Sequence, residues 1–286
     1  MTNEATIENS PPAKPRRGTS RTQKLLFFAT GWLIVLMPFL FWWNTWFGRT
    51  LSDRQLNEYL HDTRKPRHIQ QALVQVSERI TRHDTAAKQW YPELVRLAAD
   101  PVEEVRNTDA WVMGQDTSGA AFHETLLKML NDSSPMVRGN AALSLVRFGD
   151  ATGRAQIVAL LQPASIAAPQ NGRVIDSDRP GTAIHQGGLL AKLDYGHGQT
   201  EEIRSPIPGR IRSVAQTGAT VNAGAEIAVV DPANEQVWEA LRALYLVGQI
   251  DDLPAVRPYQ RDLPDISNDV RQQAEETERA IRERAK

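Results

Sequence analysis

Few side chains in this sequence stand in patterns that could do chemistry. His123-Glu124 begins the H-E-x-x-H pattern of zinc proteases, but the fifth position is Leu127, so the second metal ligand is missing. Other histidines lie among charged residues, with no tight i, i+4 cluster of histidine and acid to bind a metal; they are His61, His68 and His83. The sequence has no cysteine, phosphate-binding loop, dinucleotide-binding glycine pattern or nucleophile elbow. We therefore predict no catalytic residue, no metal, no cofactor and no enzymatic activity.

Lys192 is the one side chain that could carry a covalently attached group, and it lies within an internal duplication. Residues 166–194 align without gaps on residues 203–231, and eight of the 29 aligned positions are identical. The shared positions include residues that set turns and permit positive φ; these turn residues are Pro169, Gly172, Gly181, Gly187, Pro206, Gly209, Gly218 and Gly224. Short stretches of β-type composition run between them, so the two halves predict a compact, two-fold-related β-sandwich.

The repeated pattern P-x-x-G…G…V-x-x-G-x-x-L resembles that of biotinyl/lipoyl-like barrel-sandwich domains and of membrane-fusion (periplasmic adaptor) proteins, with Ile184 and Val221 at the valine position. In carrier domains of this kind the resemblance implies a lysine at the hairpin between the halves. Here the hairpin spans residues 194–202 and has no lysine, while Lys192, the only lysine of the segment, precedes it in a predicted strand. We therefore expect an unmodified module, and a carrier or small-ligand-binding domain that uses Lys192 is the alternative.

The tip of this hairpin has two interpretations. It is a candidate recognition point, formed by Tyr195, Gly196, His197 and Gly198. A glycine-rich turn without further function explains the same residues.

A second repeat runs through the rest of the chain. The segments 100–106, 132–138 and 265–271 each begin with aspartate and end in Val-Arg, and each stands where a loop is predicted to lead into a helix. The repeat markers are Asp100, Arg106, Asp132, Arg138, Asp265 and Arg271. Each unit predicts a pair of helices whose apolar stripe is buried only when pairs stack into a solenoid.

This repeat resembles the HEAT-repeat family, and residues 132–150 match its D-x-x-P-x-V-R-x-x-A-x-x-L core best. The marker aspartates 62, 100, 132, 231 and 265 are spaced by one repeat except between 132 and 231, where the gap is about two repeats too long. Removal of residues 163–230 restores the spacing. We therefore predict that the β-sandwich is inserted inside the fourth helix pair, at an exposed loop where a guest with neighbouring ends is tolerated.

Residues 25–47 form 23 uncharged, mostly apolar positions, enough for a helix that spans a bilayer of about 30 Å. Tryptophans gather at one end of this segment, where indole rings favour the membrane interface; these interface anchors are Trp42, Trp43 and Trp46. More lysine and arginine precede the segment than follow it, so the positive-inside rule predicts a cytoplasmic N-terminus. We expect a single-pass protein of the inner membrane, whose C-terminal domains lie outside the cytoplasm.

The predicted fold class is a multidomain α plus β protein with an N-terminal transmembrane helix, a HEAT-type α-solenoid and an inserted lipoyl-like barrel-sandwich domain. Its domains are a disordered cytoplasmic tail at 1–24, the transmembrane helix at 25–47, helical repeats at 51–162, the β insert at 163–230 and closing helices at 231–286.

Charge narrows the range of partners. The chain has 33 basic and 34 acidic side chains, a balance that argues against nucleic-acid binding. The expected partners are the bilayer and proteins of unknown identity. These features predict a non-enzymatic, membrane-anchored scaffold or adaptor in an envelope complex of the transport or secretion type. A chromophore lyase built on similar repeats is a third interpretation that no residue supports.

Overall fold

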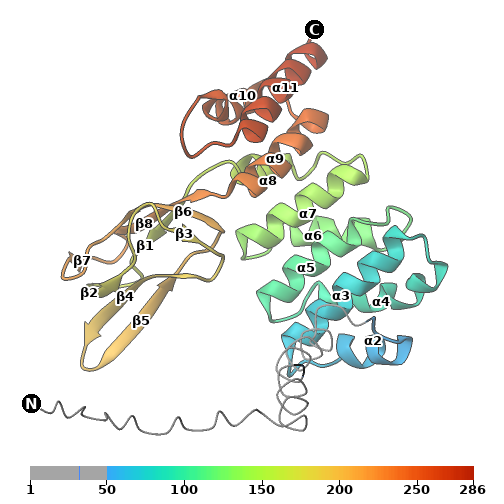
Figure 1. Cartoon of the computed structure of the whole chain (residues 1–286), viewed down its shortest axis with the longest axis horizontal. Helices are drawn as coiled ribbons and strands as arrows, with labels where there is room; N and C mark the ends of the chain where they lie inside the picture. Colours follow the sequence, from blue (N-terminus) through green and yellow to red (C-terminus); the bar gives the residue numbers. More distant parts are fainter. Residues whose placement is uncertain (1–31, 33–49) are drawn as a thin grey trace, which may run out of the picture. The chain divides into compact units, whose positions relative to one another are not determined.

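The computed structural model describes Trp32 and residues 50–286. The chain divides into a unit Met1–Thr50 and a unit Leu51–Lys286, and the helices and strands whose bounds the structure describes lie in the second unit. This unit contains ten α-helices, among shorter 3₁₀ turns, and two antiparallel β-sheets. The helices and strands are drawn and labelled in Figure 1.

The helices come before and after the strands. Before them lie α2 (Asp53–Leu60), α3 (Pro66–Thr81), α4 (Tyr91–Leu97), α5 (Glu103–Met113), α6 (Phe122–Met129), α7 (Pro135–Arg147) and α8 (Arg154–Ala159). After them lie α9 (Asn234–Val247), α10 (Leu253–Val256) and α11 (Asn268–Arg284). The 3₁₀ helices are η1 (Thr85–Trp90), η2 (Ile250–Asp252) and η3 (Arg257–Gln260).

Local sequence explains where the helices start. Ser134 precedes α7, and its hydroxyl accepts hydrogen bonds from the amides of Met136 and Val137 (3.2 and 3.3 Å). Ser267 caps α11 in the same way, accepting from Val270. A side-chain oxygen at this position satisfies an amide that the first turn leaves without an intrahelical partner. Pro135 then occupies the first turn of α7, where its missing N–H is not needed.

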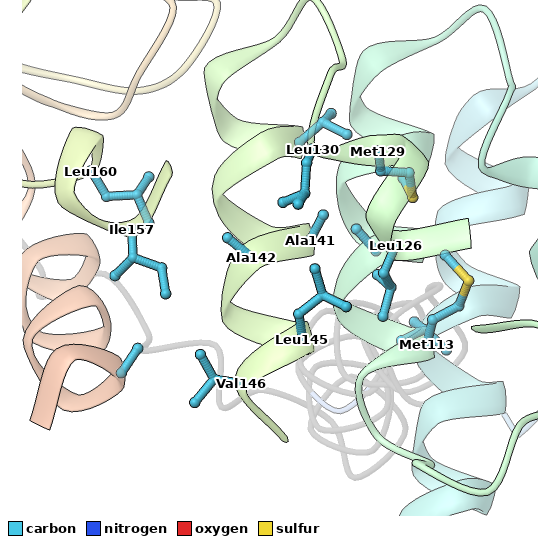
Figure 2. Packing of buried hydrophobic residues seen from close by; sticks show 14 of the residues in the cluster. Met113, Leu126, Met129, Leu130, Ala141, Ala142, Leu145, Val146, Ile157 and Leu160 are labelled. Atoms are coloured by element: carbon cyan, nitrogen blue, oxygen red, sulfur yellow. The ribbon is translucent and has the colours of Figure 1, made fainter. Parts of the chain in front are cut away.

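The helices stack through one continuous apolar core. The second helix of each pair packs on the next, in the order α3, α5, α7, α9 and α11. Leu126 of α6 and Leu145 of α7 are fully buried in this core, beside Met113 of α5 (Figure 2). Ile157 and Leu160 extend it toward α9 (Figure 2). Small residues such as Ala141 and Ala142 let neighbouring helices approach closely.

The eight strands lie between α8 and α9. They are β1 (Ala164–Ala167), β2 (Gly172–Ser177), β3 (Ala183–Ile184), β4 (Leu189–Gly196), β5 (Gln199–Arg204), β6 (Gly209–Val214), β7 (Thr220–Val221) and β8 (Glu226–Pro232). The sheets have the strand orders β1-β8-β6-β3 and β5-β4-β2-β7, and between them they bury a separate apolar cluster. We call this β structure the module and the stacked helices the array.

The two halves of the module repeat each other at the level of strand pairing. In β2 and β4, Arg173 pairs with Asp194, and the residues 37 positions later, Arg210 and Asp231, pair in the same way in β6 and β8. Both pairs of strands shift register one residue further on, between 174 and 176 and between 211 and 213. The short strands β3 and β7 each pair with the other half, so the halves are exchanged by a two-fold relation.

The structure corrects two predictions. No helix in residues 50–286 is long and apolar enough to cross a membrane, and the predicted span 25–47 falls outside the described residues except for Trp32. The fold class with a transmembrane helix is therefore replaced by a mixed helix-and-sheet class, and the single-pass inner-membrane location is withdrawn. The predicted tail 1–24 and the anchors Trp42, Trp43 and Trp46 also lie outside the described residues.

Candidate interaction surface

The repeat markers form a network of aspartate and arginine at the starts of the second helices. Asp132 accepts a hydrogen bond from the amide of Ser134 (2.8 Å), and Asp100 accepts one from Val102 (2.9 Å). Arg106 then donates back to the carbonyl of Asp100 (2.8 Å). These bonds hold each loop in the shape from which the helix starts.

One arginine of this network also joins two neighbouring repeats. Nε and Nη2 of Arg106 donate to Oδ2 and Oδ1 of Asp132 in the next repeat (2.7 and 2.9 Å). The two side chains are 14% and 11% exposed. The bidentate hydrogen bond from Arg106 lowers the pKa of Asp132, and the same bond raises that of Arg106. A shielded, bidentate pair of this kind stabilises more than a surface ion pair does.

The network changes where the module interrupts the array. Arg138 donates to the carbonyls of Asp132 and Ser133 (2.6 and 2.9 Å), as Arg106 does one repeat earlier, but in the described part of the chain it has no carboxylate partner. The next marker, Asp231, is bound instead by Arg212 of β6, and Asp265 by Arg210 of the same strand (3.3 Å). Arginines of the module therefore bind the two marker aspartates that follow the insertion.

Other contacts complete the seam between module and array. Glu103 of α5 accepts a hydrogen bond from the hydroxyl of Ser134 (2.5 Å) and a second one from Gln186 of the module. Met136 packs on the apolar cluster of the module. Within the array, next to this seam, the Tyr259 hydroxyl donates to the carbonyl of Leu161 (2.6 Å), and burial raises the pKa of Tyr259 to about 12.

The last predicted marker, Arg271, does not take part in this network. It lies in α11, where it donates to Asp262 and to the side-chain oxygen of Asn268 (2.9 Å). Both contacts stay within the C-terminal helix pair, so Arg271 does not join two repeats as Arg106 does.

The hairpin between the two halves of the module carries the candidate tip. His197 and Gly198 lie between β4 and β5, both with positive φ (53° and 78°), as a two-residue turn of type I′ requires. Tyr195 donates a hydrogen bond to Glu201 (2.7 Å), and burial together with this carboxylate raises the pKa of Tyr195 to about 12. Gly196 donates its amide to Asp194 (2.9 Å). The geometry of the turn therefore explains the glycines at the tip, and recognition of another molecule by the tip stays a prediction.

Lys192 lies in the middle of β4 and not at the tip. It faces Asp176 of β2 on one side and Glu202 of β5 on the other in the strand pairing. A carrier lysine needs a mobile position, whereas this one is held between two paired strands.

The turn glycines occupy matching places in the two halves. Gly181 and Gly218 have positive φ (86° and 93°), and their amides donate to Ile211 and Val174 (both 2.7 Å). Gly187 and Gly224 likewise have positive φ (75° and 79°). Gly172 and Gly209 begin the matched strands β2 and β6, and Pro169 and Pro206 lie in the loops just before them.

The histidines pair with carboxylates. His123 lies 2.7 Å from Asp150, and His68 lies 2.8 Å from Asp62. His61 is 3.2 Å from Glu93, while His83 sits at a turn with positive φ (58°). Within residues 50–286, no group of three or more histidines and acids is arranged to hold a metal ion.

A groove that the sequence did not predict runs across the second helices. It has a volume of about 540 Å³ and is lined by α5, α7, α9 and α11. Each helix contributes the residue six positions after its repeat valine; these are Trp111, Leu143, Ala243 and Glu276. One position of the repeat therefore forms the floor along the whole groove.

Large apolar side chains line this groove and remain exposed. Trp111 is 42% exposed, Tyr245 44% and Leu246 60%. An adjoining pocket of about 390 Å³ lies between the starts of α9 and α11 and shares Glu239 with the groove. Exposed aromatic and aliphatic groups in a concave surface make this groove the candidate interaction surface. The sequence did carry a signal for the groove, because tryptophan at an outward repeat position is unusual, but only the fold shows that four repeats align there.

Comparison with known proteins supports the helical repeat. The HEAT repeat family matches residues 124–151, which are α6, α7 and the turn between them, and this confirms the HEAT repeat predicted at 132–150. No curated protein matches the chain.

One solved structure that shows similarity is described as "Structure and function of a single-chain, multi-domain long-chain acyl-CoA carboxylase". It is 15% identical over 49% of this chain, at a TM-score of 0.24, which is too low to support any inference. The match covers 14% of that protein's own length. The lipoyl-like character of the module therefore stays a prediction.

Proposed function

We propose that this protein is a non-enzymatic scaffold that binds a partner protein in the groove across α5, α7, α9 and α11. HEAT repeats generally mediate protein–protein interaction, and the matched repeat supplies α7, the central wall of this groove. The observation that carries the proposal is the exposure of Trp111, Tyr245 and Leu246 in one groove. Aromatic and aliphatic anchors of this kind dominate the energy of protein interfaces.

We also propose that the module takes part in protein–protein interaction and carries no covalently attached prosthetic group. Its two-fold strand arrangement and the glycine-rich hairpin support an unmodified lipoyl-like domain, and the position of Lys192 within β4 argues against the carrier alternative. The intact mass of the purified protein tests this point. A mass increase equal to biotin or lipoate would contradict it, and the unmodified mass is the expected result.

The groove proposal is tested with a photo-crosslinking residue in place of Leu246, in the full chain and in its native host. We expect crosslinks to a defined segment of one partner. Once that segment is synthesised, Trp111→Ala and Leu246→Asp should each weaken its binding by about 30-fold, as the loss of an interface hot spot of about 2 kcal/mol does.

Ile250→Asp is the matched control for this experiment, because Ile250 is also a half-exposed apolar residue but lies outside the groove. Equal weakening by Ile250→Asp, or no effect of Trp111→Ala and Leu246→Asp, would contradict the proposal. Binding is measured by fluorescence anisotropy of the labelled segment.

A further inference from the structure

We infer that the segment bound in the groove is apolar at the end over the last turns of α5, α7 and α9 and basic at the end over the first turns of α9 and α11. This inference rests on the proposed function and adds the chemistry of the partner. It follows from the unequal distribution of charge and apolar surface along the groove and the adjoining pocket.

The end over the first turns of α9 and α11 is rich in unpaired carboxylates. Glu235 and Asp269 line the adjoining pocket, both are exposed, and neither has an ion-pair partner among the described residues. Glu276, on the floor of the groove, accepts a hydrogen bond from Gln272 of its own helix (3.0 Å) and has no ion-pair partner within residues 50–286. Three negative charges at this end are therefore left for a partner to neutralise.

The cations of the same surface do not cancel this excess. Arg242 stacks on the ring of Trp238 (4.6 Å) and lies 3.8 Å from Glu239, so its charge is shared within α9. Arg147 is at the other end and donates to Gln115 (2.8 Å). The residues that line the groove and the pocket thus hold four carboxylates against two guanidinium groups.

Two of these carboxylates stand at helix starts. Glu235 and Asp269 lie in the first turns of α9 and α11, next to the partial positive charge of the helix end. Both side chains are exposed, so their oxygens are free to bind donors. Lysine or arginine side chains of a partner supply those donors.

The opposite end of the groove is apolar except for Arg147. Trp111, Leu143 and Val146 line it, together with the exposed Tyr245 and Leu246 in the last turn of α9. An aromatic or leucine side chain of the partner can therefore be buried there, while basic residues further along the same segment reach Glu276, Glu235 and Asp269. Opposite charges at the rim mainly direct association and specificity, and the apolar anchor supplies most of the affinity.

The test uses synthetic peptides of about 15 residues, the length at which an isolated helix begins to be stable in water. All share one leucine- and tryptophan-containing half, and the other half carries lysines in one peptide, glutamates in a second and glutamines in a third. Binding to the full-length protein is measured by fluorescence anisotropy. We expect the lysine peptide to bind at least about tenfold more tightly than the glutamate peptide, and the difference to shrink as salt screens exposed charges.

Charge-reversal variants test whether these carboxylates cause the preference for the lysine peptide. The double variant Glu235→Lys with Asp269→Lys should abolish the preference for lysine. The control is Glu104→Lys with Asp251→Lys, which makes the same change in net charge at exposed acids outside the groove; Glu104 is also a first-turn residue, in α5. The control should retain the preference.

Each remaining outcome contradicts a specific statement. If all three peptides bind alike and Trp111→Ala releases them, the groove is a binding site but the inferred basic partner is wrong. If the control reversal removes the preference equally, the attraction is not local and the inference fails. If no peptide binding responds to Trp111→Ala and the crosslinking residue at position 246 captures no partner, the proposed function fails as well.

Discussion

Two arginines occupy the same repeat position but differ by one ion pair. Arg106 and Arg138 make the same hydrogen bonds to the preceding loop, but only Arg106 also binds an aspartate of the next repeat. Arg138 therefore serves as an internal control for the ion pair between Arg106 and Asp132.

We predict that Arg106→Gln destabilises the protein by about 2 kcal/mol, since it removes a shielded charge-assisted pair and leaves Asp132 without its partner. Arg138→Gln should cost less than about 1 kcal/mol, because only bonds to carbonyls are lost. Urea unfolding at neutral pH measures both values. Equal losses would show that the bonds to the loop carry the stability.

The same variants have a predicted pH dependence. The pKa of Asp132 is lowered in the folded state, so the pair stabilises the fold above the ordinary aspartate pKa of about 3.9 and this contribution is lost as the pH falls through the lowered value. The difference in stability between the wild type and Arg106→Gln should therefore decrease below about pH 4. An undiminished difference at low pH would contradict the assignment.

Asp109 is an acidic residue at a position where other repeats have alanine. It lies four residues after the repeat valine of α5, where α7 has Ala141 and α11 has Ala274, and both of its carboxylate oxygens are buried without a hydrogen-bond partner. Burial raises its pKa well above the ordinary value, while Arg96 opposes this rise. At pH values between the unfolded and the folded pKa of Asp109, the folded protein therefore binds one more proton than the unfolded chain.

We predict that Asp109→Ala stabilises the protein increasingly as the pH rises above the ordinary aspartate pKa of about 3.9. A raised folded pKa makes the unfolding free energy of the wild type fall by up to about 1.4 kcal/mol per pH unit, from the unfolded pKa up to the folded one. The difference between wild type and variant in urea unfolding isolates this effect, and the exposed Asp251→Ala is the control. A difference that does not change with pH would show that Asp109 is not the responsible group.

At the scale of elements, the two halves of the module offer a matched comparison of glycines. A Cβ at Gly209 would overlap the backbone oxygen of Asp231, which cannot move without opening β6 from β8. At Gly172 a Cβ would lie 2.8 Å from the ring of Tyr195 and 3.0 Å from the backbone oxygen of Asp194, a milder overlap next to the turn between β4 and β5. The same sequence position is therefore under different steric pressure in the two halves.

We predict that Gly209→Ala costs about 3 kcal/mol and Gly172→Ala about 1 kcal/mol, the upper and lower range for overpacking. Thermal unfolding, followed by circular dichroism in the β region, gives the order of the melting temperatures of the two variants. Melting of Gly172→Ala at or below the temperature of Gly209→Ala would contradict the steric argument.

The sequence was most informative where the repeat imposes a pattern. The aspartate, valine and arginine of residues 132–138 predicted the HEAT repeat because each residue has one role at the helix start, as a loop acceptor, a core residue and a donor back to the loop. The groove could not be predicted in this way, since it depends on how four helices align. Asp109 could have been noticed, because its alignment with Ala141 places a charge in the core.

Hydropathy and length alone predicted the transmembrane helix at 25–47. The structure describes no helix in residues 50–286 that could cross a membrane. The ion pairs of the Asp–Arg network could not be predicted from the sequence. Arg138 and Arg106 look the same in sequence, and only the position of the inserted module explains why one of them has no carboxylate partner.

At the scale of the whole Leu51–Lys286 unit, the array does not depend on the module for its core. The apolar cluster of the helices contains no strand residue, and α8 packs directly on α9, with Gln236 donating to the carbonyl of Leu160 (2.9 Å). We predict that replacing residues 163–232 with a short glycine-serine linker leaves the helices folded, with a melting temperature lowered by only a few degrees, since about 1 kcal/mol shifts it by about 2–4 °C at this size. Circular dichroism at helical wavelengths measures this, and loss of the cooperative transition would contradict it.

The pairing of Ala164 with Val230 has a mechanical consequence. The strands by which the chain enters and leaves the module lie side by side, so a force that pulled α8 away from α9 would peel β1 from β8 one hydrogen bond at a time, the weakest way to load a sheet. As long as α8 and α9 stay packed, tension along the array passes from helix to helix and the module carries none of it. The partner bound in the groove, which spans α7 and α9, would then act as a brace across this junction.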